Sequence, residues 1–171
     1  MSNPTRLYAD RTGAAAAEMA LSLPLLLVLT FGTFEMGYYF RCEHVVQKAV
    51  RDAVRYAARL PMTSYPGCNA TPAAPPAATE LQIENVARSG NPDGTAPQRL
   101  QGWTADPNIV KVLVSCDTSG TYTGLYSDFP MGVPKITVSA SVPYPSVFGT
   151  LGLTMPSLKL NAQSQSAAYG A

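Results

Sequence analysis

The protein has 171 residues and a formal net charge of +1 at neutral pH, and only 13% of its residues are charged. Soluble domains average about 25% charged residues, so part of this chain is expected to lie outside water. The small net charge gives no indication of nucleic-acid binding. Fifteen prolines and thirteen glycines predict that the rest of the chain is rich in loops.

The chain begins with a polar leader of thirteen residues, MSNPTRLYADRTG, which is too short to fold by itself. Its arginines, Arg6 and Arg11, place positive charge beside the apolar segment that follows. Such charge favours keeping that end of a membrane helix in the cytoplasm. Basic residues also follow the apolar segment from Arg41 onward, so charge alone predicts the orientation only weakly.

An apolar segment extends from Ala14 to Phe40, longer than the about 20 residues that a helix needs to span a bilayer. It contains two acids, Glu18 and Glu35. A helix rises about 1.5 Å per residue, which separates the two carboxylates by about 25 Å and places them near opposite faces of the hydrocarbon layer. A carboxylate at the centre of a membrane costs about 2.5–3.5 kcal/mol, so each acid is expected to have a partner or to reach an interface.

The apolar segment is not predicted to be a cleaved secretory signal. Secretory signals carry small residues after their apolar core, whereas here glycine and the alanines precede it. We therefore expect the helix to remain in the mature protein. Pro24 lies inside the helix, removes one backbone hydrogen bond and is predicted to kink it.

The polar leader, then Gly13, then Glu18 five residues later, then an apolar helix, resembles the cleavage region of type IV pilin-like precursors. The resemblance implies that a membrane peptidase cuts between Gly13 and Ala14. The new α-amine of Ala14 would be largely protonated at neutral pH. Glu18 can pair with that amine on a neighbouring subunit as the apolar helices pack side by side. The alternative is a plain signal-anchor helix with an incidental glutamate.

The helix is predicted to continue beyond Phe40 as an amphipathic extension. Its apolar residues recur at steps of three and four, namely Val46, Ala49, Val50, Ala53, Ala57 and Leu60. The opposite face carries Lys48, Arg51, Arg55 and Arg59. Asp52 is predicted to pair with Lys48 across one turn, and Pro61 to end the helix. The basic face is interpreted as solvated; contact with an acidic partner or with lipid headgroups is the alternative.

The remaining residues, 61–171, are predicted to form a small external α+β domain. A proline- and alanine-rich connection leads to a capping box at Thr79–Gln82, which is expected to start a helix from Glu80 to Arg88 that ends at Gly90. Three strands are predicted from their alternating patterns, at Ile109–Cys116, Lys135–Val142 and Leu158–Ser166.

The predicted fold is therefore α+β, with a long N-terminal pilin-like helix packed on an antiparallel sheet of about three strands. The predicted parts of the chain are a cleaved leader (1–13), a transmembrane assembly helix (14–40), an amphipathic extension (41–60) and the external domain (61–171).

Two of the three cysteines are placed to form a disulfide. Cys68 lies in a predicted turn and Cys116 ends a predicted strand. If the domain faces the periplasm, a Cys68–Cys116 bond can tie the proline-rich connection to the sheet. Cys42, beside the membrane, is expected to remain a thiol.

Several longer stretches resemble the TadE-like family, minor pseudopilins of tight-adherence (Tad/Flp) type IVc pili. These stretches are GAAAAEMALSLPLLL, the acid Glu35, AVRDAVRYAA, DPNIVKVLVSC and PKITVSASVPYPSVF. In that family, Gly13 and Ala14 would flank the cut and Glu18 would be the assembly and processing acid, with Glu35 as a second candidate. Met19 departs from the family pattern, in which an aromatic residue is frequent at this position.

The resemblance implies a protein of the bacterial inner membrane with its C-terminal domain outside the cytoplasm, or a component of the extracellular pilus. The implied role is pilus initiation, assembly or tip formation, and through the pilus adhesion. The implied partners are a prepilin peptidase, other pilins and pseudopilins, the inner-membrane assembly platform and membrane lipid, with no nucleic acid and no cofactor.

An enzyme is not predicted. His44 is the only histidine, and nucleophilic triads usually need such a base. Cys42, Glu43 and His44 are adjacent, so on a helix they point in different directions and make a poor metal site. No glycine-rich phosphate loop follows a strand.

The main competing interpretation is a membrane-anchored periplasmic or surface binding domain with an uncleaved signal anchor. Four aromatic residues could line its binding surface: Trp103, Tyr122, Tyr126 and Tyr144. We favour packing inside the domain for these four. Cleavage after Gly13 separates the two classes, because only a pseudopilin needs the free amine of Ala14.

Overall fold

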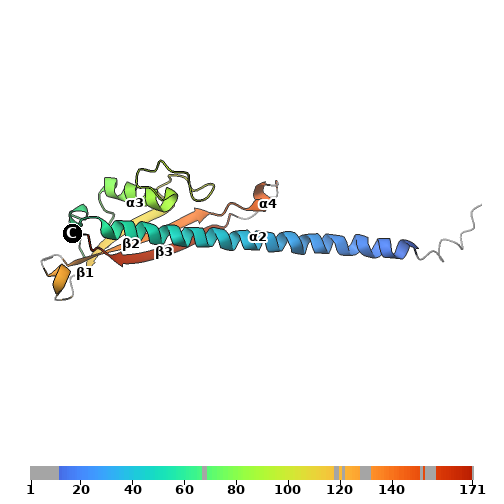
Figure 1. The fold of residues 1–171 in the computed structure, drawn as a ribbon, viewed down its shortest axis with the longest axis horizontal. Helices are drawn as coiled ribbons and strands as arrows, with labels where there is room; N and C mark the ends of the chain where they lie inside the picture. The colour runs from blue at the N-terminus through green and yellow to red at the C-terminus, as the bar shows by residue number, and fades with distance from the viewer. Residues whose placement is uncertain are drawn as a thin grey trace, which may run out of the picture. The chain divides into compact units, whose positions relative to one another are not determined.

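The computed structural model describes residues 12–66, 69–117, 120, 122–127, 132–150, 152 and 157–170. The chain divides into two compact units, Met1–Tyr38 and Tyr39–Ala171. Helix α2 (Thr12–Arg59) belongs to both units and contains 48 residues (Figure 1). This confirms the long N-terminal helix expected from the sequence.

The second unit is built on a three-stranded antiparallel sheet with the strand order β1-β2-β3. The strands are β1 (Val110–Asp117), β2 (Val133–Pro143) and β3 (Lys159–Ala167). All three predicted strands are thus confirmed, with bounds shifted by one or two residues. The register places Val112 opposite Val138, and Val138 opposite Ser164.

Alternation along the strands gives the sheet one buried and one exposed face. In β1 every second residue from Val110 is buried, and the residues between them are more exposed. Successive side chains of a strand point to opposite faces, so a strict apolar–polar alternation is enough to set the register. The buried side chains of β1 and β2 are Val110, Val112, Val114, Cys116, Ile136, Val138, Ala140 and Val142.

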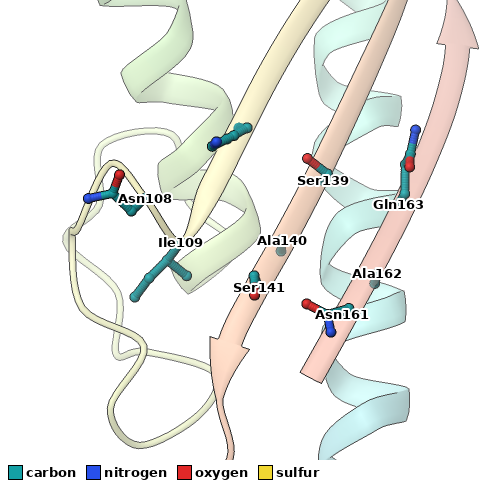
Figure 2. Close-up of a pocket in the computed structure, with 9 residues that line it drawn as sticks. Asn108, Ile109, Ser139, Ala140, Ser141, Asn161, Ala162 and Gln163 are labelled. Atoms are coloured by element: carbon teal, nitrogen blue, oxygen red, sulfur yellow. The ribbon is translucent and has the colours of Figure 1, made fainter. Parts of the chain in front are cut away.

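Both long helices cover the buried face of the sheet, as Figure 2 shows with the helices behind the strands. From the C-terminal half of α2 the fully buried residues include Cys42, Val46, Ala49, Val50, Ala53 and Ala57. From α3 (Ala77–Ser89) they include Ile83 and Ala87. Trp103, the only tryptophan, is also fully buried. Each large apolar side chain buried in this way contributes about 1.5–3 kcal/mol to folding.

The beginning of α3 corrects the predicted capping box. The helix starts at Ala77 with Pro76 as its N-cap and has no side-chain cap, and the Glu80 amide donates to the Pro76 carbonyl at 3.0 Å. Thr79 therefore lies inside the first turn. Pro76 has the extended conformation that an N-cap needs, and alanine is the best helix former, so the helix begins two residues before the threonine.

The end of α3 matches the prediction. Gly90 is the C-cap with φ of 86°, and its amide donates to the Val86 carbonyl at 2.9 Å. This left-handed conformation is open to glycine at little cost.

The predicted pair between Lys48 and Asp52 is replaced by a tertiary ion pair. Asp52 Oδ2 lies 2.9 Å from Arg99 Nη1, and both side chains are partly buried. The Arg99 amide also donates to the Arg88 carbonyl at the end of α3. The Arg99 guanidinium also donates to the Val86 carbonyl at 3.5 Å, so it loses less side-chain entropy on pairing than an exposed lysine one turn away.

Short segments close the edges of the domain. Ala73 exchanges two backbone hydrogen bonds with Val114 and so covers part of the outer edge of β1. The amides of Tyr169 and Gly170 both donate to the Ala58 carbonyl, which holds residues 169–170 against the end of α2. Three one-turn helices lie in the connections: η1 (Met62–Ser64), η2 (Gly124–Tyr126) and α4 (Val147–Thr150).

Gly170 provides a test of this C-terminal closure. A Cβ atom at this position would collide with the carbonyl oxygens of Arg59 and Leu60. We expect Gly170→Ala to lower the free energy of unfolding of the domain by about 1–3 kcal/mol, because backbone atoms must shift. The fluorescence of Trp103 during denaturant unfolding of the full chain in detergent measures this change.

Gly149→Ala in α4 is the matched control, since its Cβ would meet nothing closer than Ser146 Cβ at 3.8 Å. Equal midpoints for the two variants would show that the C-terminal segment does not hold the domain together.

Candidate functional site

The apolar half of α2 presents its side chains to its surroundings. Leu21 is 80% exposed, Val28 70% and Phe34 71%. The helix contains an 18-residue window of mean hydropathy 1.9, none of which is buried, so by length and composition it is able to cross a membrane. Burying a large apolar side chain is favourable by about 1.5–3 kcal/mol of free energy relative to leaving it in water. This surface is therefore expected to be covered by lipid or by other apolar helices. The segment therefore fits a membrane anchor.

The hydroxyl groups of the apolar half bond to the backbone of their own helix. Thr30 Oγ1 donates to the Leu26 carbonyl at 2.7 Å, Thr33 Oγ1 to the Thr30 carbonyl at 2.7 Å, and Ser22 Oγ to the Met19 carbonyl at 3.3 Å. An unsatisfied polar group costs several kcal/mol in hydrocarbon. These bonds leave Glu18 as the exposed polar side chain of the segment for which the described residues supply no partner.

Gly13, Ala14 and Glu18, the predicted processing and assembly residues, all lie near the start of α2 and are exposed. A Cβ added at Gly13 would find no atom within 4 Å, so the backbone there is open to an approaching protein. Glu18 lies one turn after Ala14, and residues four apart share a face of a helix. Within the described residues, no cation or hydrogen-bond donor contacts the Glu18 carboxylate.

Pro24 and Glu35 lie further along the same helix. Pro24 is inside α2, which is assigned as helix on both sides of it. Glu35 is partly buried, whereas Glu18 is exposed, so the two acids have different surroundings. The kink at Pro24 and the role of Glu35 as a second assembly acid stay predictions.

The outer face of the sheet carries a polar hollow (Figure 2). Ser139 and Ser141 of β2 project beside Asn161 and Gln163 of β3. Ser139 is also the register partner of Lys111 in β1. The lining combines amide and hydroxyl groups and one lysine with the apolar residues Ile109, Ala140 and Ala162, and it offers neither a carboxylate nor an imidazole. Such a surface can form hydrogen bonds with a partner but has no group suited to acid–base chemistry.

The aromatic residues considered for a binding surface make contacts inside the domain instead. Trp103 is fully buried, and Tyr126 Oη donates to the Ala168 carbonyl at 2.8 Å. Tyr144 packs edge-to-face on Tyr39 with ring centroids 5.2 Å apart. Tyr122 Oη donates to the Asp117 carbonyl at 2.6 Å. These contacts favour the packing interpretation over a shared binding surface.

A small cavity beside α3 brings together residues that the sequence did not single out. Its volume is about 250 Å³, and its lining includes Trp103, Glu84, Arg88 and Asp106. Burial raises the pKa of the Glu84 carboxyl above its usual range, and the nearby Glu80 adds to the shift. Ligand pockets usually measure about 300–1,000 Å³, so this cavity is small for a ligand site.

The backbone of Cys116 contacts the residue that follows its predicted partner in the sequence. Cys116 is buried in β1, and its amide donates to the Asn69 carbonyl at 2.7 Å. Asn69 follows Cys68, which lies outside the described residues. The backbone contact supports the Cys68–Cys116 pairing, which stays a prediction.

Thiol labelling tests this pairing and the compartment of the domain together. In protein isolated from membranes under non-reducing, denaturing conditions, we expect one reactive thiol per chain, that of Cys42. Reduction should then expose two more and lower the free energy of unfolding by about 3–4 kcal/mol. The variant Cys42→Ser is the control and should show none before reduction. Three reactive thiols without reductant would contradict both the bond and an oxidising location.

The comparisons with known proteins concern mainly α2. A family model described as TadE-like protein matches residues 13–55, from the predicted cleavage site through most of the amphipathic extension. No curated protein matches the chain. No solved structure matches it either. The resemblance to this family is thus confirmed for residues 13–55, and the sheet lies outside the matched part.

Proposed function

From the TadE-like sequence of residues 13–55, which indicates a Tad pilus-associated protein, we propose that this chain is a minor pseudopilin. A prepilin peptidase cuts it between Gly13 and Ala14. The mature subunit takes part in initiating or assembling the pilus, or in forming its tip. Other pilins, the inner-membrane assembly platform and membrane lipid are its partners, and adhesion follows from the pilus.

The observation that carries this proposal is an exposed acid near the start of an uncovered apolar helix. Glu18 lies in a segment whose hydroxyls are satisfied internally, and no described residue pairs with its carboxylate. A neighbouring subunit that supplies a cation at the same depth would neutralise the charge. The α-amine of a processed Ala14 is such a cation, and it lies one helical turn from the acid in sequence.

Cleavage would therefore control assembly through charge. In the precursor, residue 14 carries a neutral amide and is preceded by a polar leader, so Glu18 has no α-amine to bind. Hydrolysis of the Gly13–Ala14 peptide bond releases a protonated amine and removes the leader. Only then can one subunit's amine pair with another subunit's Glu18 as the two apolar helices pack, which sets the axial register between the helices.

The proposed location of the protein depends on the orientation of α2 in the membrane. The leader end of α2 faces the cytoplasm, where the peptidase acts, and the domain of residues 61–171 lies outside it. The mature subunit resides in the bacterial inner membrane or in the extracellular pilus. The two locations are stages of one process if the subunit enters the filament.

The alternative function is a membrane-anchored binding domain that keeps its N-terminal segment. The polar hollow on the outer face of the sheet is the feature that favours it, because Ser139, Asn161 and Gln163 present hydrogen-bonding groups to solvent. Such a protein has no need for a free Ala14 amine, so it would be insensitive to changes at Glu18.

We expect Glu18→Gln, present as the only copy of the protein, to reduce piliation about tenfold or more while membrane insertion stays normal. The neutral amide keeps the size of the side chain but loses the attraction to the Ala14 amine. Counts of pili and of surface-sheared pilin measure assembly, and immunoblots of membranes measure insertion.

Ser22→Ala is the control, since it removes a polar group one turn further along that already bonds within its own helix. Normal piliation with Glu18→Gln would exclude the pairing and favour the anchored binding domain.

A further inference from the structure

The outer surface of the second half of α2 carries a continuous basic row. It is defined here as Arg41, His44, Lys48, Arg51, Arg55 and Arg59, all of them exposed. Successive members are three or four residues apart. At about 100° per residue they fall within an arc of about 80°, opposite the buried face of the helix. Five of the protein's twelve lysines and arginines lie in this row.

The charges of the row are not neutralised within the described part of the chain. Asp52, the nearest acid on the helix, pairs with Arg99 at 2.9 Å. Glu43 is partly buried and accepts a hydrogen bond from Gln47. Among the described residues, Arg59 donates to a neutral hydroxyl, that of Tyr169, at 3.4 Å. Like charges four residues apart on a helix repel by about 0.2–0.5 kcal/mol per pair, so the row costs helix stability unless a partner balances it.

The length of the row argues against lipid as its main partner. Arg41 directly follows the apolar segment, and Arg59 is eighteen residues further along the same helix, a distance of about 27 Å. The headgroup region adds only about 5–8 Å on each side of the hydrocarbon layer. For a row that continues straight out of the bilayer, lipid phosphates reach Arg41 and His44, while Arg51, Arg55 and Arg59 lie beyond the headgroups.

A second copy of the chain is also a poor partner for this surface. Two identical basic rows repel each other. The described acids of the second unit are scattered, and their longest run at helical spacing is the pair Glu80 and Glu84, which covers a single turn of α3. No acidic row of matching length exists on the described part of the chain.

We propose that the basic row docks against an acidic row on the helix of a different subunit anchored in the same membrane. This inference rests on the proposed pseudopilin function, because it takes the partner from the same assembly. Parallel helices packed through their apolar halves lie about 8–10 Å apart, which brings the charged side chains of the following turns into contact. Attraction to an acidic helix and repulsion between copies together select an unlike neighbour.

Site-specific photo-cross-linking in intact cells tests the docking. Arg51→p-benzoylphenylalanine places the probe within the row of the full-length chain. Lys159→p-benzoylphenylalanine, at an exposed position of β3 outside the polar hollow, is the control. We expect irradiation at position 51 to give an adduct with another membrane-anchored subunit. Mass spectrometry should map it to a helix with acids at steps of three and four.

Charge reversal then tests the chemistry of the contact. Adding Arg55→Glu should lower the yield of this adduct about tenfold or more, and reversing the facing acid to lysine should restore it. Lys135→Glu on the sheet should leave the yield unchanged. Restoration by the double reversal shows that Arg55→Glu has not simply unfolded the domain.

Four results would overturn the docking: an adduct with a second copy of this chain, an adduct with lipid alone, a partner that lacks an acidic row, or no adduct above the control. The N-terminal residue of the chain is determined in the same sample. A chain cut after Gly13 without the adduct refutes the docking but leaves the proposed function standing. An uncut chain refutes the proposed function itself.

Discussion

The constraint on which the account depends is the uncovered apolar surface of α2 and the single exposed acid near its start. Lipid can cover the leucines and phenylalanines, but it cannot neutralise Glu18 within the hydrocarbon. The hydroxyls of Ser22, Thr30 and Thr33 are satisfied by their own helix. Under the proposed function, the partner of this charge is a cation at the same depth on a neighbouring helix, namely the α-amine of Ala14 that cleavage after Gly13 would supply.

The second half of the same helix is amphipathic. One face is buried on the sheet through small and branched residues, and the opposite face carries the basic row. The ion pair between Asp52 and Arg99 links α2 to the loop after α3. Because Asp52 is paired with Arg99, its negative charge does not neutralise the basic row. One continuous helix thus combines an apolar surface that fits a membrane anchor with a basic surface that we propose selects its neighbours outside the membrane.

Much of this fold could be predicted from the sequence, because its elements follow simple periods. The apolar spacing of α2 and the alternation of Ile136, Val138 and Ala140 are local patterns, and the structure confirms them. Predictions that depended on competition between local and distant groups were wrong. Pro76 displaced the Thr79 cap, and Arg99, forty-seven residues away, displaced Lys48 as the partner of Asp52. The spacing of Gly13 and Glu18 was visible in the sequence, whereas their exposure required the structure.

The most direct test of the central claim is the identity of the first residue of the mature protein. It can be determined by mass spectrometry on chains recovered from cell membranes and from sheared surface material, with a strain lacking the prepilin peptidase as the control. The account predicts a start at Ala14 in the parent strain and an intact leader in the control. A chain that keeps Met1 or Ser2 in cells with an active peptidase would contradict it, because Glu18 would then have no α-amine to bind.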